Sequence, residues 1–284
     1  MHLLQSKTAS KIVADVATYL ILSTLSLVIL TPVAWMLSTS LKEGGEVFLI
    51  PMRWIPQRLM WENYPKALRF IPFGRYFLNT AAITLSCMVG QLLSAPLAAY
   101  AFARLRAPGK NALFTLVLAT MMIPGQVTMI PLYLWWSRLH AIDTYVPLIV
   151  PSFCGGAFYI FLLRQFFLTI PEALGDAARI DGCGHFGVYS RVYLPLSKPA
   201  MATVAIFTFM GHWNDFMGPL IYLSGMDKWT LTLGLSRFVD MYGTTTPWHL
   251  LMAASLVTVL PCVVLYFFAQ TYFIQGIVVT GVKG

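Results

Sequence analysis

The sequence predicts an all-α fold, namely a polytopic membrane protein with six transmembrane helices and one short helix in a polar loop. Of its 284 residues, 58% are apolar and 11% are charged, whereas a soluble domain is about 45–50% apolar and about 25% charged. The mean hydropathy is +0.71, and the apolar residues occur in long runs, which is the pattern of membrane spans. This composition excludes a cytosolic enzyme, a disordered chain and a secreted disulfide-bonded scaffold.

Six segments contain the ~20 mostly apolar residues that a membrane helix needs. Within a single transmembrane domain of residues 1–284, they cover residues 12–36, 76–102, 112–136, 145–168, 201–223 and 250–273. The first segment is too long for the core of a signal peptide, and no small-residue cleavage site follows it, so we interpret it as a span. An even number of spans places both termini on the same side of the membrane.

The third segment contains a break, and the charges of the loops indicate the orientation. Pro124 and Gly125, followed by Gln126, predict a break at which backbone polar groups could line a cavity. The loop of residues 104–110 contains three basic residues, whereas the loop of residues 137–144 contains one. Because short cytoplasmic loops are rich in Lys and Arg, we expect both termini to be cytoplasmic.

The charge and the cysteines exclude several kinds of site. The net charge of +8 comes from basic residues scattered between apolar runs, which is typical of lipid headgroup contacts rather than of nucleic-acid binding. The four cysteines form no CxxC pair, so we expect neither a metal nor a cofactor in this chain. Residues 182–187 match GxGxxG but follow a predicted helix, which excludes a dinucleotide site. There is no P-loop, so any ATP would be bound by another chain.

The loop of residues 169–200 has the most unusual sequence. Thr169 and Glu172 have the spacing of a capping box, residues 173–181 are predicted to be helical, and Gly182 is predicted to end the helix in a left-handed conformation. A helix this short is not stable alone, so it docks either on its own bundle or on a partner. Its expected contact surface combines two small side chains with nearby charges, at Ala177, Ala178, Asp176, Arg179 and Asp181.

Residues 176–182 and 193–199 together look like the EAA loop of ABC-importer permeases, with Asp176 in place of the usual glutamate. More widely, the chain resembles the inner-membrane permeases of carbohydrate importers that are related to the smaller permease subunit of the maltose system. The resemblance runs from the first span to the last residue. The other stretches that carry it are residues 98–104, 122–126, 213–220 and 281–284.

The resemblance implies contacts with an ATPase at two places in the chain. The short helix of the polar loop would be a cytoplasmic coupling helix that contacts the ATPase through Asp176, Ala177, Ala178, Arg179, Asp181 and Gly182. The end of the chain would insert between the ATPase subunits through Gly281, Lys283 and Gly284. For this tail, the alternative is an apolar segment that lies along the membrane surface.

The resemblance also implies a function and a set of partners. The partners would be a second permease subunit, two ATP-binding subunits that hold ATP and Mg, an extracytoplasmic solute-binding protein and membrane lipid. The chain would be a non-catalytic subunit in a bacterial inner membrane that imports a sugar or oligosaccharide by alternating access. Glycerol-phosphate or a polyol stays open as the substrate. A stand-alone secondary transporter is a further alternative, although only Asp15 and Asp215 qualify as the ionisable groups that it would need within its spans.

Polar residues within the spans are candidates for the translocation path. They are Gln126, Asn214 and Asp215, because polar side chains in spans face the bundle interior or a water-filled path. The alternative is that they form hydrogen bonds between helices. Small residues in the second span, namely Ser94, Ala95, Ala98 and Ala99, predict close helix packing.

The segment of residues 224–247 is expected to be a flexible loop on the outer side. Its glycines at Gly225, Gly234 and Gly243 would supply the flexibility. In the maltose system the equivalent loop reaches into the binding protein, so two interpretations stay open. The loop either probes the binding protein in this way or is a solvated connector.

Overall fold

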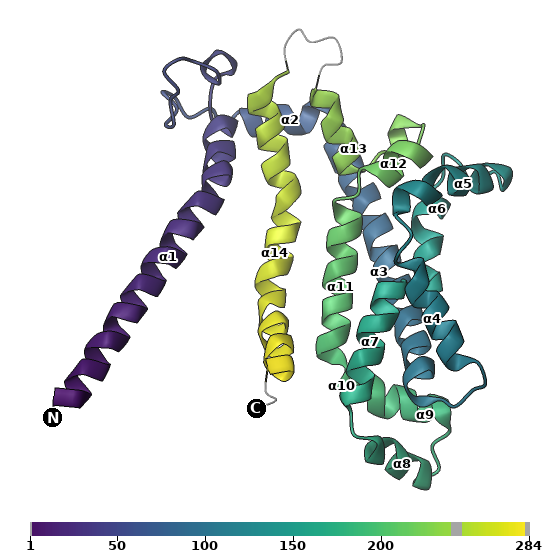
Figure 1. Cartoon of the computed structure of the whole chain (residues 1–284). Coiled ribbons are helices and arrows are strands. Elements are labelled where there is room, and N and C mark those ends of the chain that lie inside the picture. The colour runs from purple at the N-terminus through teal and green to yellow at the C-terminus, as the bar shows by residue number, and fades with distance from the viewer. Residues whose placement is uncertain (1, 240–245, 282–284) are drawn as a thin grey trace. The chain divides into compact units, whose positions relative to one another are not determined.

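The structure, a computed structural model, describes residues 2–239 and 246–281, with side chains described over residues 10–239 and 246–270. All regular structure in these ranges is helical (Figure 1). The longer helices are α1 (His2–Ser40), α3 (Phe73–Arg104), α4 (Lys110–Thr120), α5 (Gly125–Arg138), α7 (Ala157–Thr169), α11 (Lys198–Trp213) and α14 (Trp248–Gly281). The shorter ones are η1 (Gly44–Glu46), α2 (Asn63–Phe70), α6 (Val146–Ile149), η2 (Val150–Cys154), α8 (Glu172–Ile180), α9 (His185–Val188), η3 (Tyr189–Tyr193), α10 (Leu194–Leu196), α12 (Met217–Tyr222), η4 (Met226–Lys228), α13 (Leu231–Leu235) and η5 (Ser236–Phe238).

The described residues contain four to six candidate membrane spans. Four helical segments are long and apolar enough to cross a bilayer, namely Ser10–Ser40, Phe73–Arg104, Val146–Thr169 and Trp248–Gln270. Two bent pairs pass the same test only when each pair is counted as one span. Lys110–Thr120 and Gly125–Arg138 meet at 98°, and His185–Leu196 and Lys198–Trp213 meet at 78°. The predicted all-helical polytopic membrane fold is confirmed.

The third and the fifth of the expected spans are each divided into two helices at a bend. The third, expected over residues 112–136, is divided into α4 and α5 by the predicted break, because Pro124 has an extended backbone and lies directly before α5. The fifth was expected over residues 201–223, but its helix begins at Lys198, ends at Trp213 and resumes as α12. The last helix, α14, runs to Gly281, beyond residue 273, where the sixth span is expected to end.

The described residues form two compact units, which are considered separately. The first consists of Met1–Ile71 and Arg237–Val259. In it, Asn63 of α2 donates hydrogen bonds to the carbonyls of Ser40 (2.9 Å) and Lys42 (2.8 Å), which joins α2 to the end of α1. The apolar side chains of α1 from Ile12 to Val33 are exposed, as expected for a helix that faces lipid or another membrane chain.

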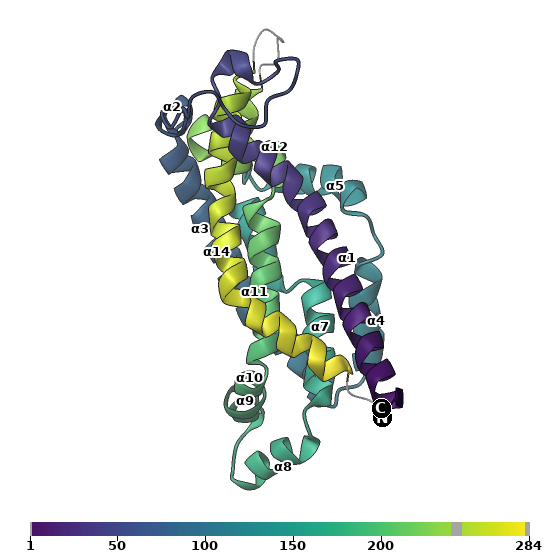
Figure 2. The same ribbon diagram turned by 90° about the vertical axis from the view of Figure 1, so that its left-hand side faces the viewer.

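The second unit consists of Pro72–Ser236 and Leu260–Gly284, and α3 is its central helix. Helices α7 and α11 run beside α3 (Figures 1 and 2). Ala95 and Ala99 of α3 are fully buried against a cluster that includes Leu163 and Phe167 of α7. These small side chains let the helices approach closely, which confirms the predicted packing of this face.

Candidate functional site

The short helix of the polar loop, α8, lies at one end of the second unit, beyond the end of α7 (Figures 1 and 2). It covers Glu172–Ile180, one residue earlier at each end than expected. The predicted capping box is wrong. Thr169 is the last residue of α7, its hydroxyl donates to the carbonyl of Phe166 (2.8 Å), and Pro171 precedes α8 without a side-chain cap.

One face of α8 packs on the rest of the unit. Gly175 is buried, and a Cβ atom there would lie 3.1 Å from the Tyr193 hydroxyl oxygen. Ala178, one turn later, is half-buried against the cluster that holds α3, α7 and η3 together. Ala178 therefore belongs to the attached face of the helix and not to the free surface that its small size suggested.

The opposite face of α8 is exposed in the part of the chain that the structure describes. Ala173, Ala177 and Ile180 are all exposed, and a period of 3.6 residues places them on the side away from Gly175 and Ala178. Ile180 is 87% exposed. The charged side chains of Asp176 and Arg179 form an exposed ion pair of 3.1 Å, and Asp181 is exposed too. The result is a small apolar surface with charges beside it.

Gly182 has a φ of +86°, so the predicted left-handed conformation is confirmed. Its N–H donates to the carbonyl of Arg179 (3.0 Å), and the next N–H, of Cys183, donates to the carbonyl of Ala178 (2.9 Å). These bonds satisfy the last carbonyls of α8 and turn the chain toward α9. Phe186 in α9 is 70% exposed. Sequence reasoning missed this side chain, although an aromatic residue in a polar loop was a usable signal.

Arg104, the last residue of α3, connects three elements at this end of the unit. Its guanidinium donates hydrogen bonds to the carbonyls of Phe167 (2.7 Å) and Ile170 at the end of α7. It also lies over the ring of Tyr193, 5.2 Å from the ring centroid. Because Tyr193 contacts Gly175 of α8, a displacement of α8 acts on a network that includes α3 and α7. The role of Arg104 was not expected from sequence.

The translocation-path candidates lie at two helix breaks. Gln126 is exposed in the first turn of α5, and within the described residues no hydrogen bond joins it to Asn214 or Asp215. The amide nitrogen of Asn214 donates to the carbonyl of Met210 (2.9 Å), one turn earlier in α11. The carboxylate of Asp215 is half-buried and accepts from the N–H of Gly218 (3.1 Å) in α12. These two bonds are local and shape the break between α11 and α12, while the carbonyl of Asp215 accepts a longer-range bond from the hydroxyl of Thr232 (2.6 Å).

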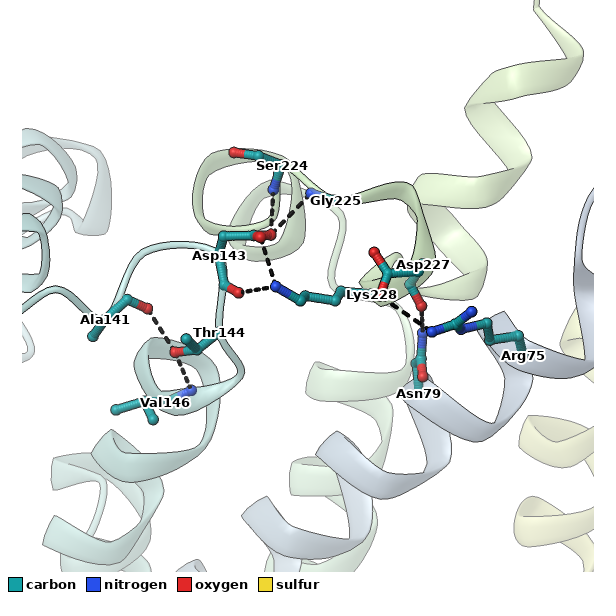
Figure 3. A network of polar contacts seen from close by, with 10 residues as sticks. All are labelled: Arg75, Asn79, Ala141, Asp143, Thr144, Val146, Ser224, Gly225, Asp227 and Lys228. Atoms are coloured by element: carbon teal, nitrogen blue, oxygen red, sulfur yellow. Dashed lines mark hydrogen bonds and ion pairs between the residues drawn. The ribbon is translucent and has the colours of Figure 1, made fainter.

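The opposite end of the second unit carries a polar network around Asp143 (Figure 3). Asp143 has a φ of +60° and donates its N–H to the carbonyl of Tyr222 (2.8 Å). Its carboxylate accepts from the N–H groups of Ser224 (3.0 Å) and Gly225 (2.9 Å) and from the ammonium of Lys228 (2.6 Å). The pKa of Asp143 is lowered to about 2, mainly by the hydrogen bond from the Gly225 N–H and further by those from the Lys228 ammonium and the Ser224 N–H. The hydrogen bond between Lys228 and the Asp143 carboxylate raises the pKa of the Lys228 ammonium.

The next residues are attached to α3 in the same network (Figure 3). Asp227 forms an ion pair of 3.1 Å with Arg75, and the amide of Asn79 donates to the carbonyls of Asp227 (3.0 Å) and Trp229 (2.9 Å). The N–H of Leu231 donates to the hydroxyl of Thr80 (2.8 Å).

The expected flexibility of residues 224–247 is therefore wrong for the first part of this segment. Residues 226–238 contain η4, α13 and η5. Gly225 is held by Asp143, and Gly234 lies against the ring of Tyr76, where a Cβ atom would overlap the ring. These two glycines permit close approach instead of supplying flexibility. Gly243 lies outside the described residues, as do Lys283 and Gly284 of the tail, while Gly281 is the final residue of α14.

Comparison with known proteins assigns this architecture to a family. Residues 92–279, more than half of the chain, match the family described as binding-protein-dependent transport system inner membrane component. The chain belongs to this family. It is a non-catalytic permease subunit of a binding-protein-dependent ABC importer and a multi-pass protein of the inner membrane. Such an importer includes an ATPase, a partner permease and a binding protein.

Two curated relatives cover nearly the full length of this permease. The arabinooligosaccharides transport system permease protein AraQ of Bacillus subtilis (strain 168) is 35% identical over 95% of this chain and 96% of its own length. The sn-glycerol-3-phosphate transport system permease protein UgpE of Yersinia pestis bv. Antiqua (strain Antiqua) is 32% identical over 93% of this chain and 96% of its own length. The resemblance to carbohydrate-uptake permeases is thereby confirmed.

A solved structure shows the same fold. A crystal structure of a bacterial ABC transporter involved in the import of the acidic polysaccharide alginate aligns with a TM-score of 0.81 and 24% identity, over 93% of this chain and 98% of that chain. Permeases of this family have no cofactor of their own. Within the described residues, no group of three or more His, Cys, Asp or Glu side chains could hold a metal ion.

Proposed function

We propose that this permease imports a sugar or oligosaccharide by alternating access, driven by ATP hydrolysis on two partner ATPase subunits. The observation that carries the proposal is the free face of α8. An apolar surface of Ala173, Ala177 and Ile180, with Asp176, Arg179 and Asp181 near it, suits a protein interface that moves. A helix attached by Gly175 and Ala178 can transmit a push from such a partner to its own bundle.

The proposed path of the movement follows contacts within the second unit. The ATPase surface would move α8, and α8 would act on Tyr193 through Gly175. Arg104 would then pass the displacement to α3 and to the end of α7, because its guanidinium contacts Tyr193 and the carbonyls of Phe167 and Ile170. Movement of these helices would change access to a path beside the breaks at Gln126 and at Asn214 and Asp215.

We assign the Asp143 network to the outer side of the membrane and α8 to the cytoplasmic side. The two features lie at opposite ends of α3 within one unit (Figure 1). The network holds residues 222–231 on α3 and on the loop before α6, so it offers the binding protein an ordered base. The residues after this base are the part proposed to reach into the binding protein. Both termini are proposed to be cytoplasmic.

A neutral sugar fits the break between α11 and α12 better than a phosphate ester does. The charged side chain at this break is the carboxylate of Asp215, and α12 itself contains no charged residue. Carboxylates accept hydrogen bonds from hydroxyl groups but repel a phosphate anion. The 35% identical relative is named for arabinooligosaccharides, which points in the same direction. Glycerol-3-phosphate, for which the 32% identical relative is named, is the alternative.

The test uses the complex purified from native membranes through an affinity tag on this permease and reconstituted in vesicles. The binding protein and labelled solute are outside, and ATP is inside. We expect ATP-dependent accumulation of oligosaccharide and none of glycerol-3-phosphate. Accumulation of glycerol-3-phosphate alone would establish the alternative substrate. Uptake by the permease alone, driven by an ion gradient, would refute the ABC coupling and identify a secondary transporter.

A further inference from the structure

The candidate span Val146–Thr169 contains a break that was not expected from sequence. It begins as α6 and η2, then loses helical structure at Gly155 and Gly156, and resumes as α7. Gly155 has a φ of +74°, a conformation that other residues rarely adopt. A break of this kind leaves backbone N–H and C=O groups without their helical partners. Inside a membrane those groups must find other partners within the protein.

One face of α3 supplies these partners. The amide of Gln91 lies at the break, between the carbonyl of Ser152 and the N–H of Gly156. In the amide orientation that satisfies both of its polar atoms, its nitrogen donates to the carbonyl of Ser152 (3.3 Å) and its oxygen accepts from the N–H of Gly156 (2.7 Å). The hydroxyl of Ser94 is shared between two carbonyls, that of Gly90 one turn earlier (2.7 Å) and the same Ser152 carbonyl (3.1 Å). Gln91 is 3% exposed, so water does not compete for these bonds. A buried glutamine in a membrane helix is thus explained by the backbone that it satisfies.

Helix α7 is consequently held by α3 at both of its ends. At the N-terminal end of α7, the amide oxygen of Gln91 accepts from the N–H of Gly156, the residue directly before the helix. At its last turn, Arg104 bonds the carbonyls of Phe167 and Ile170. Between these points α7 is an unbroken helix of 13 residues, and Pro171 separates Ile170 from α8. A displacement of α8 therefore acts on the C-terminal end of α7, while the break lies at the N-terminal end of α7.

We propose that Gln91 is a positioning residue that fixes the Gly155–Gly156 break as the pivot of α7. With the amide in place, α7 turns about the break when α8 moves, and the segment before the break moves with it. Without the amide, the unsatisfied groups rearrange and the break absorbs the displacement. This inference rests on the proposed function, because it assumes that α8 is driven by an ATPase.

The experiment compares Gln91→Leu with Gln270→Leu, a matched control that removes a glutamine of a different helix, α14. Both complexes are reconstituted, and the moles of solute imported per mole of ATP hydrolysed are measured with the basal ATPase rate. For Gln91→Leu we expect unchanged complex yield and basal rate, with imported solute per ATP lower by at least about tenfold, because the variant removes two buried hydrogen bonds and each contributes about 1 kcal/mol. The control retains the wild-type ratio.

Two milder variants keep the proposal testable if Gln91→Leu does not accumulate. Gln91→Asn retains the amide on a side chain that is one methylene shorter, and Ser94→Ala removes the hydroxyl that lies near the Ser152 carbonyl. We expect a smaller loss of solute per ATP in each. A wild-type ratio in Gln91→Leu, or in both milder variants, overturns the inference. A wild-type complex that shows no ATP-dependent import refutes the proposed function instead, so the two failures are distinguishable.

Discussion

The helix stop at Gly182 permits a prediction that separates backbone strain from steric contact. Gly182 has a φ of +86°, whereas Gly184, two residues later, is extended with a φ of −70°. A Cβ atom would meet no atom within 4 Å at either position. The variants Gly182→Ala and Gly184→Ala therefore add the same methyl group in the same loop and differ in the backbone conformation that it must accept.

The size of the effect follows from this conformation. A left-handed backbone costs an L-residue about 1–2 kcal/mol relative to the right-handed region. This energy corresponds to a factor of about 5–30 in the population of the correctly formed turn. Because the turn directs the chain from α8 to α9, we expect Gly182→Ala to lower substrate-stimulated ATPase activity by a factor in this range, with normal membrane insertion. Gly184→Ala is expected to match the wild type.

The assay is ATP hydrolysis by the reconstituted complex, with and without the loaded binding protein, after the amount of inserted permease has been measured. Gly182→Trp extends the series, since its bulk would also lift α8 from the ATPase surface, and so does a bulky residue at Asp176. Equal stimulation in Gly182→Ala and Gly184→Ala would refute the reasoning from φ. Wild-type stimulation in Gly182→Trp would refute the assignment of this turn to coupling.

Three further predictions concern other parts of the permease. Ile180→Asp should abolish co-purification of the ATPase without lowering permease yield, because Ile180 is 87% exposed, and normal co-purification would show that this face is not the interface. The pKa of Asp143 is lowered from the usual 3.8 to about 2, so its carboxylate stabilises the network fully above pH 3.8 and this stabilisation is lost as the pH falls through about 2. Hydrogen exchange should therefore show the Ser224 and Gly225 amides as protected at pH 4 as they are at pH 7. Loss of protection between pH 5 and pH 4 would contradict this. Deletion of residues 280–284 should preserve insertion and permease pairing but weaken ATPase co-purification or its stimulation by substrate, whereas full recovery of both would indicate a membrane-surface tail.

Features that depend on neighbouring residues were predictable from the sequence alone. Long apolar runs specify membrane helices because each span satisfies its own backbone hydrogen bonds. The break before α5 follows from Pro124, and the left-handed stop after α8 follows from Gly182, since both are conformational properties of the residue itself. The family resemblance rested on similarly local stretches, such as residues 176–182.

The tertiary structure decided which side chains meet across long stretches of chain. Asp143 and Gly225 are 82 residues apart, and Arg104 and Phe167 are 63 residues apart. Local periodicity carries no information about such pairs, so the order of residues 222–231 and the link from α8 to α3 could not be predicted. The same limit applies to Ala178, whose small side chain fits a free surface or a packed one equally well. The position of Tyr193, at the end of η3, decides that Gly175 and Ala178 face inward and that Ala177 and Ile180 stay exposed.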